Sequence, residues 1–440
     1  MNSKFVFTIQ RLLSSTPRFE ACIYACHGGF QTRGMSTNSQ QLNPMEVHQA
    51  VSDLPNTRKQ IDPEAFKNAV IRSGINFFCG VPDSLLKHFC AVVSQTVSPD
   101  NHIITVNEGS AVAMATGYHL STGKSAMVFL QNSGLGNIVN PMMSLASSAV
   151  YSIPMLLLIG WRGQTGVKDE PQHMAQGQIT PQMLELMNIP CEVLPQDLEQ
   201  AEAVLDRAAT YMAEKKSAYS ILVQAETFSS YTLKKEKNLQ FPMMREEALK
   251  VIVDRLESDD IIVSSTGMLS RELFEYRAKK GSGHARDFLT VGSMGYASSI
   301  AFSIAKQKPD RKVFCLDGDG AALMHMGAMA TIGQSHQTNF KHIVFNNGAH
   351  DSVGGQPTLS GPNNTFSFRN IAQACGYKQA WITTTEHELA ECMDQLASAE
   401  GPVLLQVDIR LGHRTDLGRP TRTPVENKND FMQFLQNARN

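Results

Sequence analysis

The sequence predicts an α/β protein made of two related domains, each a mainly parallel sheet that helices cover on both faces. Three observations support this prediction. The chain has 440 residues, more than a single hydrophobic core usually accommodates. Near-continuous runs of Val, Ile, Leu and Phe alternate with helical stretches from Pro63 onward, as in parallel strands that are buried on both faces. Residues 63–84 and 244–270 then show the same succession of helix, strand and glycine-containing turn.

Ten strands are expected, five in each half, from short apolar segments bounded by polar or glycine-rich turns. Ligands of open parallel sheets bind at the carboxyl ends of such strands, so we expect the functional site there. The expected strands of the first half are Asn76–Cys79, Ile103–Val106, Ala126–Leu130, Met155–Gly160 and Tyr219–Gln224. Those of the second half are Ile261–Ser265, Phe288–Val291, Val313–Leu316, His342–Asn346 and Val403–Val407.

The predicted organisation has four parts. Residues 46–228 form the first domain and residues 244–430 form the second. Residues 229–243 between them are charged and contain a proline, which indicates a linker. Residues 1–45 are expected to lie outside the fold, because their composition is that of a targeting segment.

This N-terminal segment has the composition of a mitochondrial transit peptide. It is rich in Ser and Thr, and its apolar residues recur at roughly helical spacing. The alternative is a disordered basic tail, so the expected location is the mitochondrial matrix and otherwise the cytoplasm. The segment carries four basic residues against one acidic residue: Lys4, Arg11, Arg18, Arg33 and Glu20.

The overall composition argues against several classes of protein. The net charge of −2 gives no basic surface for nucleic acid. No segment approaches the about 20 uninterrupted apolar residues that a membrane span needs. The eight cysteines have neither zinc-type nor disulfide-type spacing, which favours reduced thiols in an intracellular compartment.

A Gly-Asp-Gly sequence centred on Asp319 follows an apolar strand, and Asn346 and Asn347 follow the next one after 25 residues, 321 to 345. A right-handed crossover of this length lays the two strands side by side, so these polar groups emerge at one edge of the sheet. Carboxylate, amide and carbonyl oxygens suit Mg²⁺. The glycines and a helix expected to start near Ala321 suit a diphosphate. The segment therefore predicts a site for a metal-bound diphosphate.

Simpler interpretations of these residues exist. Asp319 is a possible helix N-cap, and Asn347-Gly348 a possible tight turn. The occurrence of both sequences at this spacing favours the metal site. A P-loop-like stretch at residues 117–125 is discounted, because five residues separate its glycines where that motif needs four.

This combination resembles the thiamine-diphosphate (ThDP) enzymes, whose motif runs from Gly-Asp-Gly to an Asn-Asn pair. The resemblance extends over nearly the whole chain from about residue 50. It implies that Asp319, the side chain of Asn347 and the carbonyl of Ala349 bind Mg²⁺. It further implies diphosphate contacts from Thr266, Gly267, Gly318, Asp319, Gly320 and Ala321.

The same resemblance assigns the pyrimidine end of the cofactor. Met294 would lie under the cofactor and bend it, and the carbonyl of Gly292 would accept a hydrogen bond from the 4′-amino group. The segment VNEGSAVAMATGY resembles the one that carries the activating glutamate, which is Glu108 here. Its carboxyl would share a proton with the pyrimidine, a role that needs a buried group with a raised pKa. The alternative is a helix-start glutamate that the dipole favours.

The domain order resembles that of the 2-oxoacid decarboxylases, although the linker is too short for a middle domain and no adjacent His-His pair occurs. Segments such as CGVPDSLLK and FNNGAHDSVGGQPT most resemble members that convert 3-phosphonopyruvate to phosphonoacetaldehyde and CO₂, a step toward 2-aminoethylphosphonate. Sulfopyruvate or another 2-oxoacid is the alternative substrate. A catalytically silent ThDP-binding scaffold subunit is the alternative from another class, and the presence of Glu108 with Asp319 and Asn347 argues against it.

A substrate with a phosphonate and a carboxylate needs cations nearby. Arg162, Lys168 and His173 follow an expected strand and are candidates, and an arginine offers a bidentate contact. The alternative for them is a solvated loop. Asp83 is a candidate proton relay by analogy with an acidic residue of related decarboxylases. His350 is a candidate for supporting the site or moving protons, and its alternative is a packed, hydrogen-bonded histidine.

The resemblance also implies an assembly. One ThDP must contact Glu108 on the first domain and the Asp319 site on the second, and in this family the two domains around a cofactor come from different subunits. We therefore expect a homodimer or higher homo-oligomer with equivalent shared sites. The other expected partners are the substrate, ThDP and Mg²⁺, with no nucleic acid and no membrane.

Overall fold

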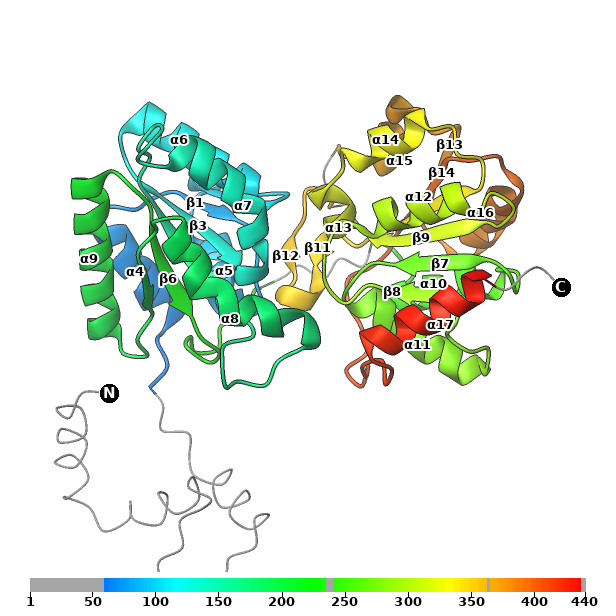
Figure 1. Ribbon diagram of the computed structural model, residues 1–440, viewed down its shortest axis with the longest axis horizontal. Helices are drawn as coiled ribbons and strands as arrows, with labels where there is room; N and C mark the ends of the chain where they lie inside the picture. The colour runs from blue at the N-terminus through cyan, green and yellow to red at the C-terminus, as the bar shows by residue number, and fades with distance from the viewer. Residues whose placement is uncertain (1–58, 235–239, 362–364, 437–440) are drawn as a thin grey trace, which may run out of the picture. The chain divides into compact units, whose positions relative to one another are not determined.

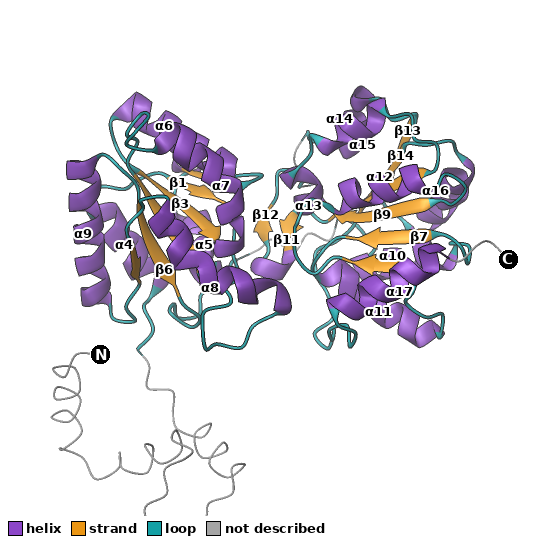
Figure 2. Cartoon of the chain, viewed as in Figure 1, coloured by secondary structure: helices purple, strands orange, loops and turns teal. Residues whose placement is uncertain are grey.

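The computed structural model describes residues 59–234, 240–361 and 365–436. It contains two six-stranded sheets in which every strand pair is parallel, and a short two-stranded hairpin (Figures 1 and 2). The expected α/β class with two parallel sheets is confirmed. The predictions for residues 1–45 lie outside the described residues, and the exact domain limits stay a prediction.

The first sheet is built from short strands that alternate with helices. Its strands are β1 (Phe78–Gly80), β2 (His102–Ile104), β3 (Ala126–Gln131), β4 (Met155–Gly160), β5 (Cys191–Val193) and β6 (Tyr219–Val223). Its helices are α4 (Pro63–Arg72), α5 (Lys87–Thr96), α6 (Glu108–Thr122), α7 (Leu135–Pro141), α8 (Pro171–Leu186) and α9 (Leu198–Lys215).

The second sheet follows the same plan. Its strands are β7 (Ile261–Ser264), β8 (Asp287–Leu289), β9 (Val313–Gly318), β10 (Phe340–Asn346), β13 (Gln379–Thr383) and β14 (Val403–Asp408). The hairpin strands are β11 (Ala349–His350) and β12 (Gln356–Pro357). The helices are α10 (Arg245–Asp254), α11 (Met268–Lys280), α12 (Ala297–Gln307), α13 (Asp319–Met324), α14 (Ala328–Gln334), α15 (Phe368–Cys375), α16 (Glu386–Ser398) and α17 (Pro424–Gln436).

The two sheets share one winding order. The first runs β2-β1-β3-β4-β6-β5, and the second, read from its other edge, runs β8-β7-β9-β10-β14-β13. When the strands of each sheet are renumbered from its own first strand, both orders become 2-1-3-4-6-5. The similarity that the sequence showed only as a pattern is therefore a similarity of topology.

Each sheet has a hydrophobic core on both faces. In β3, Met127 and Phe129 pack on one face with residues of α4, α5 and α9, while Val128 and Leu130 pack on the other with residues of α6 and α7. In the second sheet, Phe314 faces the cluster of α10, α11 and α16, and Cys315 faces that of α12, α14 and α15. This two-sided burial explains why the strands read as continuous apolar runs.

Two sheet strands were missed by the sequence analysis, β5 and β13. Both lie at the outer end of a sheet, beside β6 and β14 respectively. Edge strands are partly solvated, so their residues are mixed in character: β5 is the three-residue segment Cys-Glu-Val, and β13 carries an exposed Gln379. The apolar part of each is short, whereas the other two edge strands, β2 and β8, carried enough apolar residues to be predicted.

Among the described residues, no helix combines the length and apolar character that crossing a membrane requires. Six of the eight cysteines fall in the described part of the chain, and all six are free thiols.

Candidate active site

The Gly-Asp-Gly sequence lies where β9 ends and α13 begins. The parallel neighbour β10 pairs with β9 as expected, so the ends of the two strands meet at one edge of the sheet. Helix α13 starts at Asp319 itself rather than near Ala321, and it ends at Met324. Its N-cap is Gly318, so Asp319 is not the cap that the simpler interpretation proposed.

The two asparagines after β10 have different surroundings. The side-chain amide of Asn346 donates to Oδ1 of Asp408 over 2.8 Å and to the carbonyl of Ser360 over 3.1 Å, which makes it an anchor for the strand end. Asn347 Oδ1 accepts the backbone N–H of Ala349 over 3.0 Å, and Gly348 has a φ of +68°. The segment is therefore a tight turn, and this turn presents the predicted ligands Asn347 and Ala349.

The carboxylate of Asp319 is almost fully buried and receives two hydroxyl groups that the sequence analysis missed. Thr358 Oγ1 donates to its Oδ2 over 2.5 Å and Ser360 Oγ donates to the same oxygen over 2.8 Å. Burial raises the pKa of Asp319 to about 6, and these hydroxyl bonds oppose the rise. The two residues follow the hairpin in the stretch QPTLS, whose polar character resembled that of an ordinary loop.

Gly320 is the point where other predicted residues converge. A Cβ at this position would lie 3.0 Å from the ring of His350 and 3.3 Å from the methyl group of Met294. The structure thus brings Met294 and His350 to the Gly-Asp-Gly turn. Burial lowers the pKa of His350 to about 4, so this histidine is neutral at neutral pH.

Two further turns that the sequence assigned to the cofactor follow β7 and β8. Thr266 Oγ1 donates to the carbonyl of Val291 over 2.9 Å, which joins the turn after β7 to the segment after β8 that contains Gly292. Gly267 caps α11 with a φ of +96°, a conformation that favours glycine. Their contacts with a diphosphate stay a prediction.

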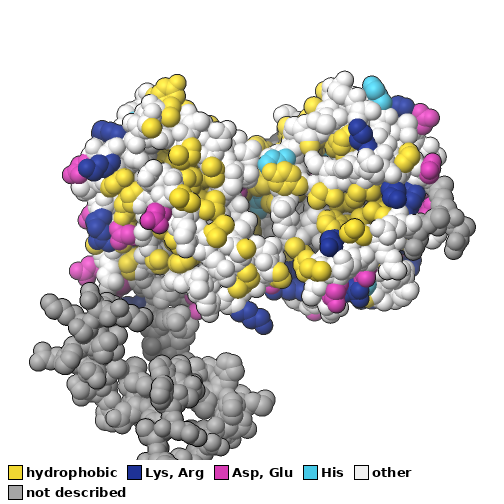
Figure 3. All heavy atoms as spheres, viewed as in Figure 1, with side chains coloured by type: hydrophobic (Ala, Val, Ile, Leu, Met, Phe, Trp, Pro, Cys, Tyr) yellow, Lys and Arg dark blue, Asp and Glu magenta, His cyan; other side chains and the backbone are white. Residues whose placement is uncertain are grey.

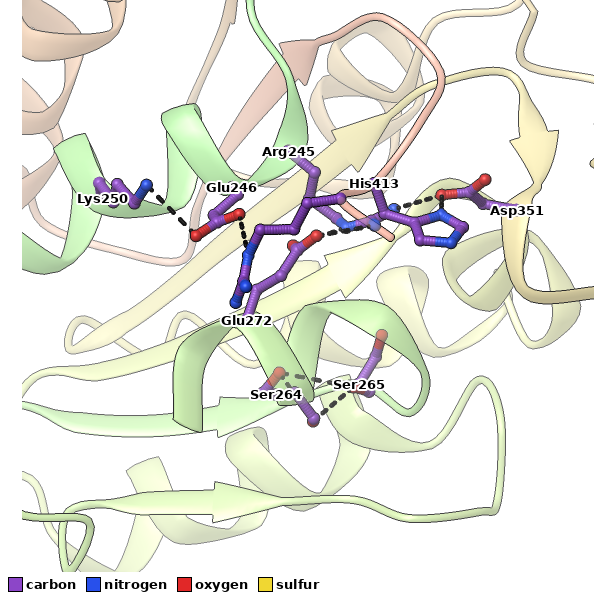
Figure 4. A network of polar contacts seen from close by, with 10 residues as sticks. Arg245, Glu246, Lys250, Ser264, Ser265, Glu272, Asp351 and His413 are labelled. Atoms are coloured by element: carbon purple, nitrogen blue, oxygen red, sulfur yellow. Dashed lines mark hydrogen bonds and ion pairs between the residues drawn. The ribbon is translucent and has the colours of Figure 1, made fainter. Parts of the chain in front are cut away.

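A buried charge network fixes the loop that follows the predicted metal ligands (Figure 4). Arg245 makes a bidentate ion pair with Glu272, at 2.8 and 3.0 Å, and its Nη1 reaches Oδ2 of Asp351 at 3.1 Å. His413 Nδ1 lies 3.3 Å from the same Asp351 oxygen. The network ties the segment after His350 to helices α10 and α11.

In the first domain, Glu108 is the first residue of α6 and is 5% exposed. Asn137 Nδ2 donates to its Oε2 over 2.7 Å, and a Cβ at Gly134 would lie 2.4 Å from its Oε1. Burial raises the pKa of Glu108, and the Asn137 bond opposes this. The residue does begin a helix, but its burial distinguishes it from a solvated helix-start glutamate. Its catalytic role stays a prediction.

Asp83 is fully buried after β1, and protein groups surround its carboxylate. Its Oδ2 accepts the backbone N–H groups of Leu85, over 2.6 Å, and Leu86, over 3.1 Å. Gln131 Nε2 donates to its Oδ1 over 2.5 Å. Burial raises the pKa of Asp83, and the Gln131 bond lowers it. These contacts give Asp83 a turn-forming role beside the predicted proton relay.

The three predicted substrate cations have different environments. Arg162 is bound to Asp169, with Nε to Oδ2 at 2.7 Å, and its Nη1 donates to Ser84 Oγ over 2.8 Å. Lys168 is exposed, as in the solvated-loop alternative. His173 is buried, which lowers its pKa to about 4, so it carries no positive charge at neutral pH. Desolvation favours the neutral imidazole, and a substrate contact of His173 stays a prediction.

The second-domain residues fit a hard divalent cation with a diphosphate. The groups at the ends of β9 and β10 offer a carboxylate, an amide oxygen and a backbone carbonyl, which is an oxygen-only set. Glycine at position 320 lets the backbone lie close to the ring of His350 and the methyl group of Met294, which a Cβ would meet at 3.0 and 3.3 Å.

Comparison with known families matches both halves of the chain. Residues 64–184 match the model described as "Thiamine pyrophosphate enzyme, N-terminal TPP binding domain", and residues 265–407 match "Thiamine pyrophosphate enzyme, C-terminal TPP binding domain". The chain belongs to the thiamine pyrophosphate enzyme family.

Within this family the chain is similar to proteins named phosphonopyruvate decarboxylase. The one from Streptomyces viridochromogenes is 32% identical over 380 residues, which are 82% of this chain and 92% of that protein. The one from Streptomyces hygroscopicus is 30% identical over 82% of this chain and 90% of that protein. A sulfopyruvate decarboxylase from Methanosarcina acetivorans is 24% identical over 83% and 95% respectively. The resemblance to this group of decarboxylases is confirmed.

Proposed function

We propose that the protein catalyses the ThDP- and Mg²⁺-dependent decarboxylation of 3-phosphonopyruvate to phosphonoacetaldehyde and CO₂, a step toward 2-aminoethylphosphonate. The observation that carries the proposal is that one chain contains both a buried, hydrogen-bonded Glu108 and the oxygen set of Asp319, Asn347 and Ala349. This pairing occurs in a chain that matches named phosphonopyruvate decarboxylases over nearly their whole length.

Bound ThDP would supply a nucleophilic carbon and an electron sink. The protein's own contribution begins with Glu108, which holds a proton more readily than a solvated carboxyl because it is buried. Asn137 engages Oε2, so Oε1 is the oxygen we assign to the pyrimidine ring. Met294 and Gly292 would border the cofactor on the second domain.

Asp319, Asn347 and the carbonyl of Ala349 would hold Mg²⁺, and the metal would bind the diphosphate. Gly318, Gly320 and Ala321 would offer backbone groups to the same diphosphate, together with Thr266 and Gly267. Arg162 remains our candidate for binding an anionic group of the substrate. That role requires Asp169 to share or release the guanidinium, since the two are paired in the structure.

The decisive experiment measures CO₂ release by the purified protein with ThDP and Mg²⁺ on three substrates, phosphonopyruvate, sulfopyruvate and pyruvate. We expect the highest kcat/KM on phosphonopyruvate. A higher kcat/KM on sulfopyruvate or pyruvate would identify that compound as the preferred substrate. No turnover of any of the three would support a scaffold role instead.

Sulfopyruvate is the second candidate substrate, because relatives named sulfopyruvate decarboxylase match either most of the chain or one part of it. Methanocaldococcus jannaschii proteins named sulfopyruvate decarboxylase subunit beta and subunit alpha match 44% and 39% of this chain. The sulfonate and phosphonate groups are similar tetrahedral anions that differ in charge, so the same cations would serve both.

We also propose that the protein works as a homodimer or higher homo-oligomer. Large hydrophobic side chains are exposed along α6, α7 and the π-helical segment Met142–Ala146 that follows, where Met114, Val139 and Met143 are 37–40% exposed. Hydrophobic surface is visible over these helices in Figure 3. Exposed apolar patches of this kind mark association surfaces.

Import into mitochondria is a separate proposal that depends only on the composition of residues 1–45. Removing residues 1–35 should leave the activity intact and abolish import of a fluorescent fusion. A truncated fusion that still reaches mitochondria would disprove the targeting role.

A further inference from the structure

We propose that Thr358 and Ser360 are positioning residues for the metal, which hold Oδ2 of Asp319 so that this carboxylate offers one oxygen and thereby favours Mg²⁺ over Ca²⁺. The inference rests on the proposed function in one respect, namely that the Asp319 site binds a divalent cation with ThDP.

The geometry that supports this is a closed triangle of oxygens. Thr358 Oγ1 lies 2.5 Å and Ser360 Oγ 2.8 Å from Asp319 Oδ2, and the two hydroxyl oxygens are 2.9 Å apart. All three side chains are buried, with 2–5% of each residue exposed. Both hydroxyls therefore contact one oxygen of the carboxylate.

The number of protons limits which of these contacts are hydrogen bonds. Each hydroxyl has one proton to donate, and an ionised carboxylate can only accept. Two protons cannot serve all three contacts, and we assign both to Oδ2 because its contacts, at 2.5 and 2.8 Å, are shorter than the 2.9 Å contact between the hydroxyls. With two short donors on Oδ2, the other oxygen, Oδ1, is the one we assign to the metal.

The two hydroxyls are themselves held in place by the predicted metal-binding turn. The backbone N–H of Thr358 donates to the carbonyl of Gly348 over 2.9 Å, and Gly348 stands between the ligands Asn347 and Ala349. The carbonyl of Ser360 accepts Asn346 Nδ2 over 3.1 Å. The frame that sets the hydroxyls is thus continuous with the frame that sets the ligands.

Single-oxygen binding distinguishes the two cations. Mg²⁺ requires near-ideal octahedral geometry with short bonds, whereas Ca²⁺ is larger and readily takes both oxygens of a carboxylate. Freeing Oδ2 removes the restraint that suits Mg²⁺ and gives Ca²⁺ a second oxygen. Loss of a hydroxyl should therefore weaken the binding of Mg²⁺ more than the binding of Ca²⁺.

The test is a calorimetric titration of Mg²⁺ and of Ca²⁺ into the full-length protein with saturating ThDP. We expect Thr358→Val and Ser360→Ala each to weaken Mg²⁺ by about 10- to 100-fold, the usual effect of removing a support for a metal ligand. Ca²⁺ affinity should stay within a few-fold of wild type, so the ratio of the two affinities should fall. Thr358→Ser, which keeps the hydroxyl, should have the wild-type ratio of the two affinities.

Thr383→Val is the matched control. Thr383 is a buried threonine at the end of β13, in the second six-stranded sheet, and its Oγ1 has no hydrogen-bond partner in the described part of the chain. The Thr383→Val substitution should leave the affinities for Mg²⁺ and Ca²⁺ unchanged. The inference would be overturned if Thr358→Val lowered the affinities for Mg²⁺ and Ca²⁺ equally, or if neither Thr358→Val nor Ser360→Ala lowered the Mg²⁺ affinity. If wild type itself binds no ThDP with Mg²⁺, the proposed function fails instead.

Discussion

Asn137 Nδ2 donates to Glu108 Oε2 over 2.7 Å, although the two residues belong to different helices. The bond fixes one oxygen of the buried carboxyl, and the other lies against Gly134. Residues of the stretch after β3 therefore decide how the predicted catalytic carboxyl is presented.

Glu108→Gln should bind ThDP with nearly wild-type affinity but lose turnover by about 100-fold or more, as expected when a positioned proton donor is removed. An amide is close in size to the carboxyl but cannot exchange the required proton. Steady-state kinetics and calorimetry with ThDP check the two parts. Turnover within a few-fold of wild type would remove Glu108 from the catalytic role.

Gly134→Ala should reduce kcat on the order of 100-fold, because the new Cβ would lie 2.4 Å from Glu108 Oε1 and displace the carboxyl. Gly136→Ala is the matched control in the same segment. A Cβ there would have no neighbour within 4 Å, so kcat should not change and the helix should be slightly more stable. Equal effects of the two substitutions would contradict the proposed packing.

Asp319→Ala should abolish Mg²⁺-dependent ThDP binding, because the diphosphate loses its metal bridge. Chelation of Mg²⁺ from the wild-type protein should have the same effect in calorimetry. Thermal unfolding would show that the variant is still folded. Wild-type cofactor affinity in the folded variant would disprove the metal site.

His102→Phe should make the protein more resistant to acid. Burial lowers the pKa of His102 to about 4 from its ordinary 6.5, so below pH 6.5 the unfolded chain binds a proton that the folded chain does not. This group's contribution to stability is therefore lost as the pH falls from about 6.5 to about 4. As the pH falls over that range, the free energy of unfolding of the variant should rise by on the order of 2 kcal/mol relative to that of wild type. Urea unfolding at several pH values measures this difference. The same dependence of the free energy of unfolding on pH in the two proteins would disprove the prediction.

Mixing Glu108→Gln chains with Asp319→Ala chains should restore activity if each site combines domains from two subunits. In a mixed dimer one site then carries both lesions and the other carries none. Subunit exchange should be verified with differently tagged chains. Exchange without recovered activity would show that each chain builds its own site.

The sequence predicted the central strands well because burial on both faces leaves a continuous apolar signal. β4 was predicted with its exact limits, Met155–Gly160, and β9 was predicted with its start at Val313. The edge strands β5 and β13 left no such signal. The spacing predicted that Asp319 and Asn347 emerge at one edge of the sheet, since a crossover of 25 residues constrains their positions. Their assignment as metal ligands came from the family resemblance and stays a prediction.

The supporting residues could not be predicted in the same way. Thr358 and Ser360 reach Asp319 from 39 and 41 residues away, across a hairpin whose register the sequence does not specify. Asn137 reaches Glu108 from a helix that no motif connects to it. The pairing of Arg162 with Asp169 likewise depends on the conformation of a loop. Contacts of this kind depend on tertiary structure, which local patterns do not encode.

The shared winding order makes the two sheets repeats of one structural unit. The first unit carries an acid group at the start of a helix after its second strand, and the second carries the predicted cation ligands after its third and fourth strands. Each unit has its own cores on both faces and borrows no strand from the other. A gene break between β6 and α10 would therefore yield two polypeptides with complete sheets, and fission of such a protein into paired genes would need no redesign of either interior.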